Sequence, residues 1–223
     1  MAARRPDLLC VAHFPWRLPD ALLGIAPLGG INLHPSLLPR HRGPLPLCWV
    51  YHADDRETGV TVHHLTSKMD AGDIIARRSF ALPRAYPVDD LNADNARVGA
   101  EALQSAIRAL AQGTADRHPQ DESQVTLAPM VRPGDRLVDF DAWDAERVWH
   151  FMAGLWARFR EPLMDGANSP VQYGGVLGFE SGSSMAPLGR VRQVDAGRLA
   201  LGCRDGLVWL RTVEADDPAG QPR

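Results

Sequence analysis

The chain has 223 residues, of which 45% are hydrophobic and 23% charged, a composition that describes a globular protein with enough chain for one large domain or two modest ones. Its 24 basic and 27 acidic residues leave a formal net charge of −3, so there is no global positive field of the kind that recruits a nucleic acid. Three widely separated cysteines predict free thiols in a reducing cytoplasm rather than a disulfide framework.

Predicted strands and helices alternate through the first half of the chain, which is typical of an α/β sheet. The run Leu8–Ala12 is short and continuously apolar, as in a strand buried on both faces of a parallel sheet. Further along, we expect strands at 31–34, 58–65 and 73–82 and helices at 44–53 and 88–111. The last two strands are predicted to pair as a hairpin-like unit, and the long helix to pack on the sheet.

The second half of the chain predicts a separate, smaller domain. Residues 114–133 are polar with scattered prolines, which indicates a linker. Asp144–Arg160 is a predicted helix with an apolar stripe, and from Val171 onward short apolar runs separated by Gly and Asp predict a small antiparallel barrel. We therefore expect a first domain at 1–118, a linker at 119–133, a second domain of one helix and a small β-barrel at 134–215, and a tail at 216–223.

Three polar side chains are expected at the ends of strands or in loops, where open α/β sheets deliver groups to a shared crevice: Asn32, His34 and Asp70. An amide, an imidazole and a carboxylate are the usual tools for moving an acyl group to an amine. Taken singly, His34 could be a strand-end histidine bound to a carbonyl, and Asn32 could satisfy turn backbone groups. Asp70 or Asp73 could cap the following turn, in which Gly72 would supply the unusual backbone angles.

The run INLHPSLLPRHRG, followed by ETGVTVHHL and MDAGDII, resembles the family of formyltransferases that use 10-formyltetrahydrofolate, whose members act on methionyl-tRNA, glycinamide ribonucleotide, sugar amines or siderophore amines. An Asn-x-His pair, an SLLP loop and a distant Asp-x-Gly-Asp recur in the right order with family-like spacing. Convincing similarity covers Pro6–Phe80, and weaker similarity covers Leu137–Val213. The resemblance implies an incomplete doubly wound, Rossmann-like catalytic domain, an OB-like barrel after it, and 10-formyltetrahydrofolate as the formyl donor.

The resemblance also implies roles for particular residues. Asn32 and His34 would stabilise the oxyanion that forms when an amine attacks the formyl carbon, with His34 as the proton donor. Asp70 would accept the proton of the amine, directly or through water, or keep His34 charged, and the sequence leaves these roles open. Arg40 and Arg42 are expected to be solvated. The folate would lie against two loops that contain His13, Phe14, Pro15, Trp16, Leu18, Ser36, Leu37, Leu38 and Pro39.

The acceptor is predicted to be a primary amine of a small molecule. From Val131 to Arg223 the chain has 11 arginines and 13 acidic residues, a local balance of −2 that disfavours tRNA. Methionyl-tRNA formylation, hydrolysis of the formyl folate, and a truncated, inactive folate-binding or interaction module remain as alternatives. No spacing of histidines and cysteines predicts a metal site, and no apolar run approaches the ~20 residues of a membrane helix.

The resemblance further predicts strands ahead of the first one in this chain. A complete domain of the family resembles a doubly wound sheet that opens with a β-α-β half before the strand matching Leu8–Ala12. Without that half, this apolar strand would be an exposed edge and an aggregation liability. We therefore expect a true start upstream of Met1, a natural remnant, or strands supplied by another chain such as a homo-oligomer partner, in that order of preference.

Overall fold

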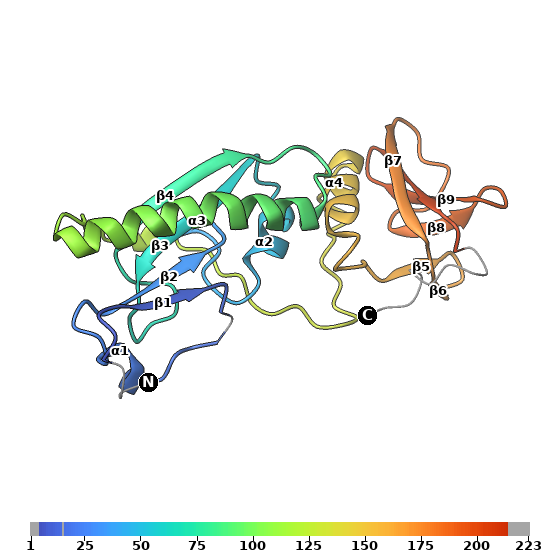
Figure 1. Ribbon diagram of the computed structural model, residues 1–223. Coiled ribbons are helices and arrows are strands. Elements are labelled where there is room, and N and C mark those ends of the chain that lie inside the picture. The colour runs from blue at the N-terminus through green and yellow to red at the C-terminus, as the bar shows by residue number, and fades with distance from the viewer. Residues whose placement is uncertain (1–4, 15, 214–223) are drawn as a thin grey trace. The chain divides into compact units, whose positions relative to one another are not determined.

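The computed structural model describes residues 5–14 and 16–213, and these residues form two compact units (Figure 1). The first unit contains the described residues up to Leu82 together with Asp90–Val131. The second contains Pro83–Asp89 and the described residues from Arg132 onward. Pro15, which was predicted to line the folate, and the predicted tail at 216–223 lie outside the described residues. Each unit has its own sheet and its own core.

Four strands form the sheet of the first unit, in the order β1 (Leu9–Ala12), β2 (Gly30–His34), β3 (Glu57–His64) and β4 (Ile74–Ala81). β1 is parallel to β2, whereas β2 with β3 and β3 with β4 are antiparallel pairs. The α/β class and the hairpin-like pairing of the last two strands are therefore confirmed. Helices α1 (Asp20–Leu23) and α2 (Pro46–His52) lie in the connections on either side of β2.

Alternating side chains along β2 and β3 divide this sheet into an apolar face and a polar face. The apolar face packs on the long helix α3 (Val88–Gln112), as predicted (Figure 1), in a buried cluster that contains Ile31, Leu33, Val60, Val62, Ala102 and Ala106. Each fully buried Val, Leu or Ile contributes roughly 1.5–3 kcal/mol to stability. Because successive strand residues point to opposite faces, Asn32, His34 and His63 project from the other side of the same two strands.

The second unit combines one helix with a six-stranded sheet. Helix α4 (Ala145–Leu155) begins after Asp144, whose side chain accepts a hydrogen bond from the Arg147 amide and so caps the first turn. The sheet has the order β6-β5-β8-β9-β10-β7. Its strands are β5 (Leu163–Asp165), β6 (Pro170–Val171), β7 (Gly175–Ser181), β8 (Arg190–Gln193), β9 (Arg198–Cys203) and β10 (Gly206–Arg211).

The predicted small antiparallel barrel is not found among the described residues. β6 and β7 stand at opposite edges of the sheet, and the β5–β8 pair is parallel. Closing a barrel requires the two edge strands to pair with each other. β6 has only two residues, and Pro170 has no N–H to contribute to a ladder. The sheet therefore stays open, and the mostly buried strands β9 and β10 form its centre.

The described residues contain three free thiols. Cys48 and Cys203 are buried, as expected of small hydrophobic side chains, whereas Cys10 is exposed on β1. None of the helices in this part of the chain combines the length and apolar character needed to cross a membrane. Within the same residues, no group of three or more His, Cys, Asp or Glu side chains is placed to hold a metal ion.

A buried carboxyl group in the second unit has an unusual pKa. Glu161 is 2% exposed, and its two carboxylate oxygens accept a hydrogen bond from the Leu137 amide at 3.0 and 3.2 Å. Burial raises the pKa of Glu161 from 4.5 to about 7, although the Leu137 and Val138 amides and the charge of Arg136 act in the opposite direction. Between these pH values the folded state holds a proton that the unfolded state has lost, so the free energy of unfolding falls as pH rises.

The substitution Glu161→Gln should remove this pH dependence because an amide does not ionise. Relative to the variant, the unsubstituted chain should lose up to about 3 kcal/mol of unfolding free energy as pH rises through this window. Urea denaturation reports this loss through the second unit's tryptophans, Trp143, Trp149, Trp156 and Trp209. The exposed-residue variant Glu101→Gln serves as control and should follow the unsubstituted chain. An unaltered pH dependence in Glu161→Gln would show that the pKa of Glu161 is not raised.

Candidate active site

The three predicted catalytic side chains lie together on the polar face of the first sheet. Asn32 and His34 project from β2, and Asp70 lies in the loop between β3 and β4. Asn32 Nδ2 is 3.4 Å from Asp70 Oδ1, and His34 Nδ1 is 3.6 Å from Asp70 Oδ2. The exposed fraction is 6% for Asn32, 4% for His34 and 9% for the Asp70 side chain. Solvent therefore screens the interactions between them only weakly.

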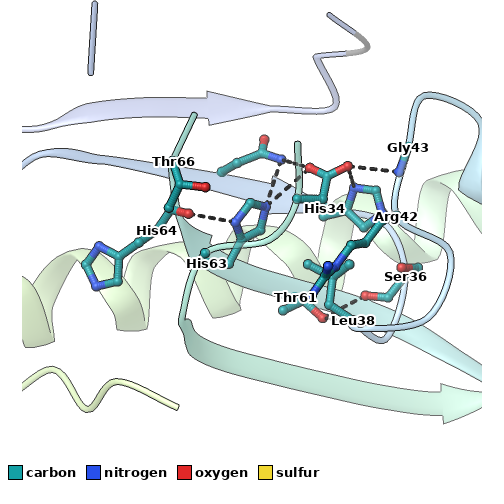
Figure 2. Close-up of polar contacts among 12 residues, drawn as sticks. His34, Ser36, Leu38, Arg42, Gly43, Thr61, His63, His64 and Thr66 are labelled. Carbon is teal, nitrogen blue, oxygen red and sulfur yellow. Dashed lines mark hydrogen bonds and ion pairs between the residues drawn. The ribbon is translucent and has the colours of Figure 1, made fainter. Parts of the chain in front are cut away.

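A fourth side chain, His63, completes this cluster and was not among the predicted site residues. β2 and β3 pair with Asn32 opposite His63, which places the imidazole beside the amide. His63 Nε2 is 3.2 Å from Asn32 Nδ2 and 3.4 Å from Asp70 Oδ1. The ring of the neighbouring His64 points the other way (Figure 2). Alternation in TGVTVHHL separates the two histidines, but only the strand register shows which one faces Asn32.

Backbone carbonyls determine which ring nitrogens carry protons. His34 Nε2 lies 2.9 Å from the carbonyl oxygen of His41. His63 Nδ1 lies 2.9 Å from the carbonyl oxygen of His64. Because a carbonyl oxygen only accepts, these two nitrogens donate, and the second ring nitrogens, His34 Nδ1 and His63 Nε2, lie on the Asp70 side. In a neutral His34 ring, Nδ1 is therefore an acceptor. The sequence left open that His34 is simply a strand-end histidine bound to a carbonyl. Its Nε2 atom does have such a partner, but its Nδ1 atom faces the cluster.

The charges of the cluster follow from these surroundings. Burial lowers the pKa of His34 below its usual value, against the charge of Asp70 and the hydrogen bond to His41. The His34 ring is therefore neutral near pH 7. Burial acts to raise the pKa of Asp70, but the hydrogen bond with His63 and the positive charges that the His34 and His63 rings carry when protonated outweigh it. Together with the Gly43 amide, they hold the pKa of Asp70 below 3.8, so this carboxylate is ionised at neutral pH.

The backbone of two loops fixes the carboxylate. The Gly43 amide donates a hydrogen bond to Asp70 Oδ2 at 3.0 Å. Gly43 has a φ of 130°, and a methyl group on it would lie 2.6 Å from the Ala128 carbonyl oxygen, so only glycine fits. In the loop between β3 and β4, Asp70 itself adopts the left-handed conformation, with a φ of 52°. We expected the unusual backbone angles at Gly72, so this prediction was wrong. Gly72 is required for space, since a methyl group there would lie 1.9 Å from the His64 carbonyl oxygen.

The Asn32 amide leaves one buried atom without a partner. Its NH2 group is turned toward His63 and Asp70, an orientation that the Asp70 carboxylate requires because a carboxylate oxygen only accepts. Its Oδ1 atom has no hydrogen-bond partner among the described residues. A buried acceptor left unpaired costs about 1–3 kcal/mol. A ligand that brings an N–H group to Oδ1 would recover this free energy.

The residues predicted to contact folate lie on two loops of different character. In the first loop Phe14 is 46% and Trp16 67% exposed, His13 is exposed and Leu18 half-buried. In the second loop Ser36, Leu38 and Pro39 are buried and Leu37 is half-buried. The first loop thus offers aromatic surface to solvent, whereas the second is part of the packed scaffold.

Two hydroxyl groups, one in the loop after β2 and one on β3, form hydrogen bonds that hold this loop in its conformation. Ser36 Oγ donates to the Arg40 carbonyl oxygen at 2.7 Å. Thr61 Oγ1 donates to the Ser36 carbonyl oxygen at 2.7 Å and accepts a hydrogen bond from the Leu38 amide at 3.1 Å (Figure 2). The Ser36 proton is therefore used inside the loop, which is held rigidly against β3.

Two arginines in the loop after β2, Arg40 and Arg42, are paired with carboxylates. We expected both of them to be solvated instead. Arg40 contacts Asp55, whose other oxygen is 2.7 Å from His41 Nε2. Arg42 is 8% exposed, and its Nη2 atom is 2.8 Å from Glu122 Oε1. Glu122 belongs to a short 3₁₀ turn, η2 (Glu122–Gln124), in the stretch predicted as a linker. This stretch therefore contacts the loop that carries the catalytic motif.

Sequence comparisons place these residues in a known group of proteins. A family model described as formyl transferase matches residues 1–107. The methionyl-tRNA formyltransferase of Roseiflexus castenholzii is 33% identical over 229 residues, which cover 99% of this chain and 69% of the relative. The enzyme of the same name from Limosilactobacillus fermentum is 31% identical, with 98% and 67% covered. The chain spans between 43% and 69% of the length of such relatives.

Solved structures with the same fold accompany these sequence relatives. HypX from Aquifex aeolicus, in complex with tetrahydrofolic acid, has a TM-score of 0.68 at 22% identity, and the match covers 94% of this chain and 36% of that one. WlaRD, described as a sugar 3N-formyl transferase in the presence of dTDP and 5-N-formyl-THF, has a TM-score of 0.68 at 13% identity, with 97% and 77% covered. At these identities the likeness concerns the fold alone.

The substitution Gly43→Ala should disrupt the loop that holds the carboxylate. The added methyl group clashes with the Ala128 carbonyl oxygen and strains the backbone, so we expect a loss of about 1–3 kcal/mol in unfolding free energy. Gly24→Ala is the matched control, because a methyl group there meets nothing within 4 Å. It should change stability by less than about 0.5 kcal/mol. Urea denaturation of both variants measures the difference, and equal stabilities would refute this account of Gly43.

Proposed function

Because the chain belongs to the formyl transferase family, we propose that it moves a formyl group from 10-formyltetrahydrofolate to a primary amine. The observation that carries this proposal is the pairing of the ionised Asp70 carboxylate with a neutral His34 whose Nδ1 faces it at 3.6 Å, beside the Asn32 amide. Formyl transfer to an amine needs a group that takes a proton and a charge that stabilises the group once it holds that proton, and His34 and Asp70 can supply these.

His34 is the better base of the two. General-base catalysis is most effective when the pKa of the base lies near the working pH. The pKa of Asp70 is held below its usual acidic value, so its carboxylate has little tendency to take a proton at pH 7. The neutral His34 ring presents Nδ1 as an acceptor, and the nearby negative charge stabilises the imidazolium that forms. This favours the role in which Asp70 acts through His34.

Proton transfer then balances over the whole reaction. As the amine nitrogen bonds to the formyl carbon, His34 Nδ1 takes one proton from it. His34 returns that proton to the nitrogen from which the formyl group departs. Asn32 Oδ1, which lacks a partner, accepts an N–H of the incoming amine and directs its lone pair. This role replaces oxyanion stabilisation by Asn32, because its NH2 group is turned toward His63 and Asp70.

The formyl donor fits the two loops near the cluster. Tetrahydrofolate carries the formyl group on a nitrogen, and its pterin is a flat ring that binds well to aromatic surface. Exposed Phe14 and Trp16 supply such surface, and the buried Leu38 belongs to a rigid wall. Solved relatives of the same fold that are described with tetrahydrofolic acid or 5-N-formyl-THF support this choice of donor.

A small molecule is the acceptor that the charge of the second unit favours. Residues 131–223 hold 11 arginines and 13 acidic residues, so this part of the chain lacks the excess of positive charge with which proteins bind RNA phosphates. Methionyl-tRNA is the second candidate, favoured by the names of the sequence relatives. To distinguish the acceptors, the chain and the formyl donor are incubated with amino sugars, with methionyl-tRNA, or with neither. A formylated sugar or a formylated tRNA identifies the acceptor, and formate released when neither is present indicates hydrolysis.

The substitution Asp70→Asn tests the site directly. It should slow formyl transfer by about 10²–10⁴-fold. Since the charge of Asp70 raises the pKa of His34, the acid limb of the pH–rate profile should also move to lower pH. His64→Gln is the control, because that ring points away from the cluster (Figure 2), and it should transfer at the normal rate. An unchanged rate in Asp70→Asn would refute the proposed site, and a slow rate with an unshifted limb would exclude His34 as the base.

A further inference from the structure

One side chain links the two loops of the site and takes no part in the chemistry proposed above. Gln120 follows α3 by eight residues, in the polar stretch predicted as a linker. Its Nε2 group donates hydrogen bonds to the carbonyl oxygens of Asp70 and Gly72, each at 2.8 Å. Its Oε1 atom accepts from Arg42, from Nε at 3.0 Å and from Nη2 at 2.8 Å. Both ends of the amide are thus used, one on each loop.

The Arg42 side of this link is itself fixed. Arg42 is 8% exposed, and its remaining N–H groups bind both carboxylate oxygens of Glu122 at 2.8 and 3.2 Å. Its backbone forms a short ladder with the returning chain, in which the Arg42 amide donates to the Thr126 carbonyl and the Ala128 amide donates to the Arg42 carbonyl. The guanidinium is therefore a rigid support for Gln120 rather than a mobile surface group.

The Asp70 side of the link is where a support is needed. Asp70 has a left-handed φ of 52°, a conformation that aspartate adopts more readily than most residues but that still costs free energy relative to the right-handed region, so hydrogen bonds to this turn help to hold it. The carbonyls that Gln120 binds lie on Asp70 itself and two residues beyond it, so the amide spans this turn. The next residue after Arg42 is Gly43, whose amide holds the Asp70 carboxylate at 3.0 Å. Backbone and side chain of Asp70 are thus tied to the same loop.

We propose that Gln120 is a positioning residue, which holds the turn around Asp70 so that the carboxylate stays beside His34 and the Gly43 amide. This inference rests on the proposed formyl transfer. Gln120 acts through Asp70 and touches no reacting atom. Gln120 binds Arg42 in the loop after β2, but its hydrogen bonds do not include residues 36–39 of that loop or any residue of the loop after β1, which are the segments expected to lie against the folate. The effect should therefore fall on the rate of transfer and not on the binding of the formyl donor.

The variants Gln120→Met and Gln124→Met form a matched pair for the test. Both lie in the same stretch, but Gln124 binds Asp121 and not the site. A displacement of about 1 Å at a reacting group costs on the order of 10²-fold, so Gln120→Met should lower kcat by about 10- to 100-fold with little change in the KM for 10-formyltetrahydrofolate. The acid limb of the pH–rate profile of Gln120→Met should shift to lower pH, as in Asp70→Asn. Gln124→Met should retain both kcat and KM.

Combination with Asp70→Asn separates this role from a general loss of structure. If Gln120 acts through Asp70, the double variant should be no slower than Asp70→Asn alone. If the fold-losses of rate in the two single variants multiply in the double variant, Gln120 does not act through Asp70, and the positioning role is overturned while the proposed function stands. An unchanged rate in Asp70→Asn would overturn the proposed function and this role with it. His34 titration followed by NMR gives a readout without turnover, and its pKa should fall in Gln120→Met.

A second variant keeps the test decisive if Gln120→Met does not fold. Gln120→Glu retains the acceptor for Arg42 but loses both donors to the turn around Asp70. It should therefore be as slow as Gln120→Met or slower, since a carboxylate is repelled by the carbonyl oxygens of Asp70 and Gly72. A Gln120→Glu chain with the normal rate and pH profile would show that the donors are unimportant, and the inference would be wrong.

Discussion

A negative charge buried on the polar face of a sheet is the constraint on which the candidate site depends. The Asp70 carboxylate gains from being ionised only because His34, His63 and the Gly43 amide surround it and outweigh the cost of burial. Each partner comes from a different segment: β2, β3, and the loop after β2. The strand register, the tight approach at Gly43 and the left-handed turn at Asp70 are all requirements of this one charge.

The same two strands supply both the stability of the first unit and its chemistry. Ile31 and Leu33 bury their side chains against α3, while Asn32 and His34 between and after them face the cluster. A packed core permits little movement, so the polar residues that alternate with it are held as rigidly as the apolar ones. This explains how side chains can be placed for proton transfer with one ring nitrogen of His34 fixed by the His41 carbonyl.

Local patterns predict much of this structure, and non-local pairings account for what they miss. The Asn-x-His motif and the Asp-x-Gly-Asp turn identify three members of the cluster, and periodicity identifies α3 and the β3–β4 pair. His63 was missed because its partner is set by strand register, which no short pattern encodes. Gln120 was missed because it binds a turn 50 residues earlier in the chain. The prediction of a barrel was wrong for the same reason, because closure depends on pairing between two edge strands, β6 and β7, that do not pair.

Direct titration of the Asp70 carboxyl group tests the central claim, that the cluster holds this residue ionised beside a neutral His34. Carbon-13 NMR of the aspartate side chains, with Asp70→Asn used to assign the signal, follows protonation in the chain without any ligand. We expect the pKa of Asp70 to lie below 3.8. A pKa at or above that value would mean that burial outweighs the surrounding donors, and the account of the site would be contradicted.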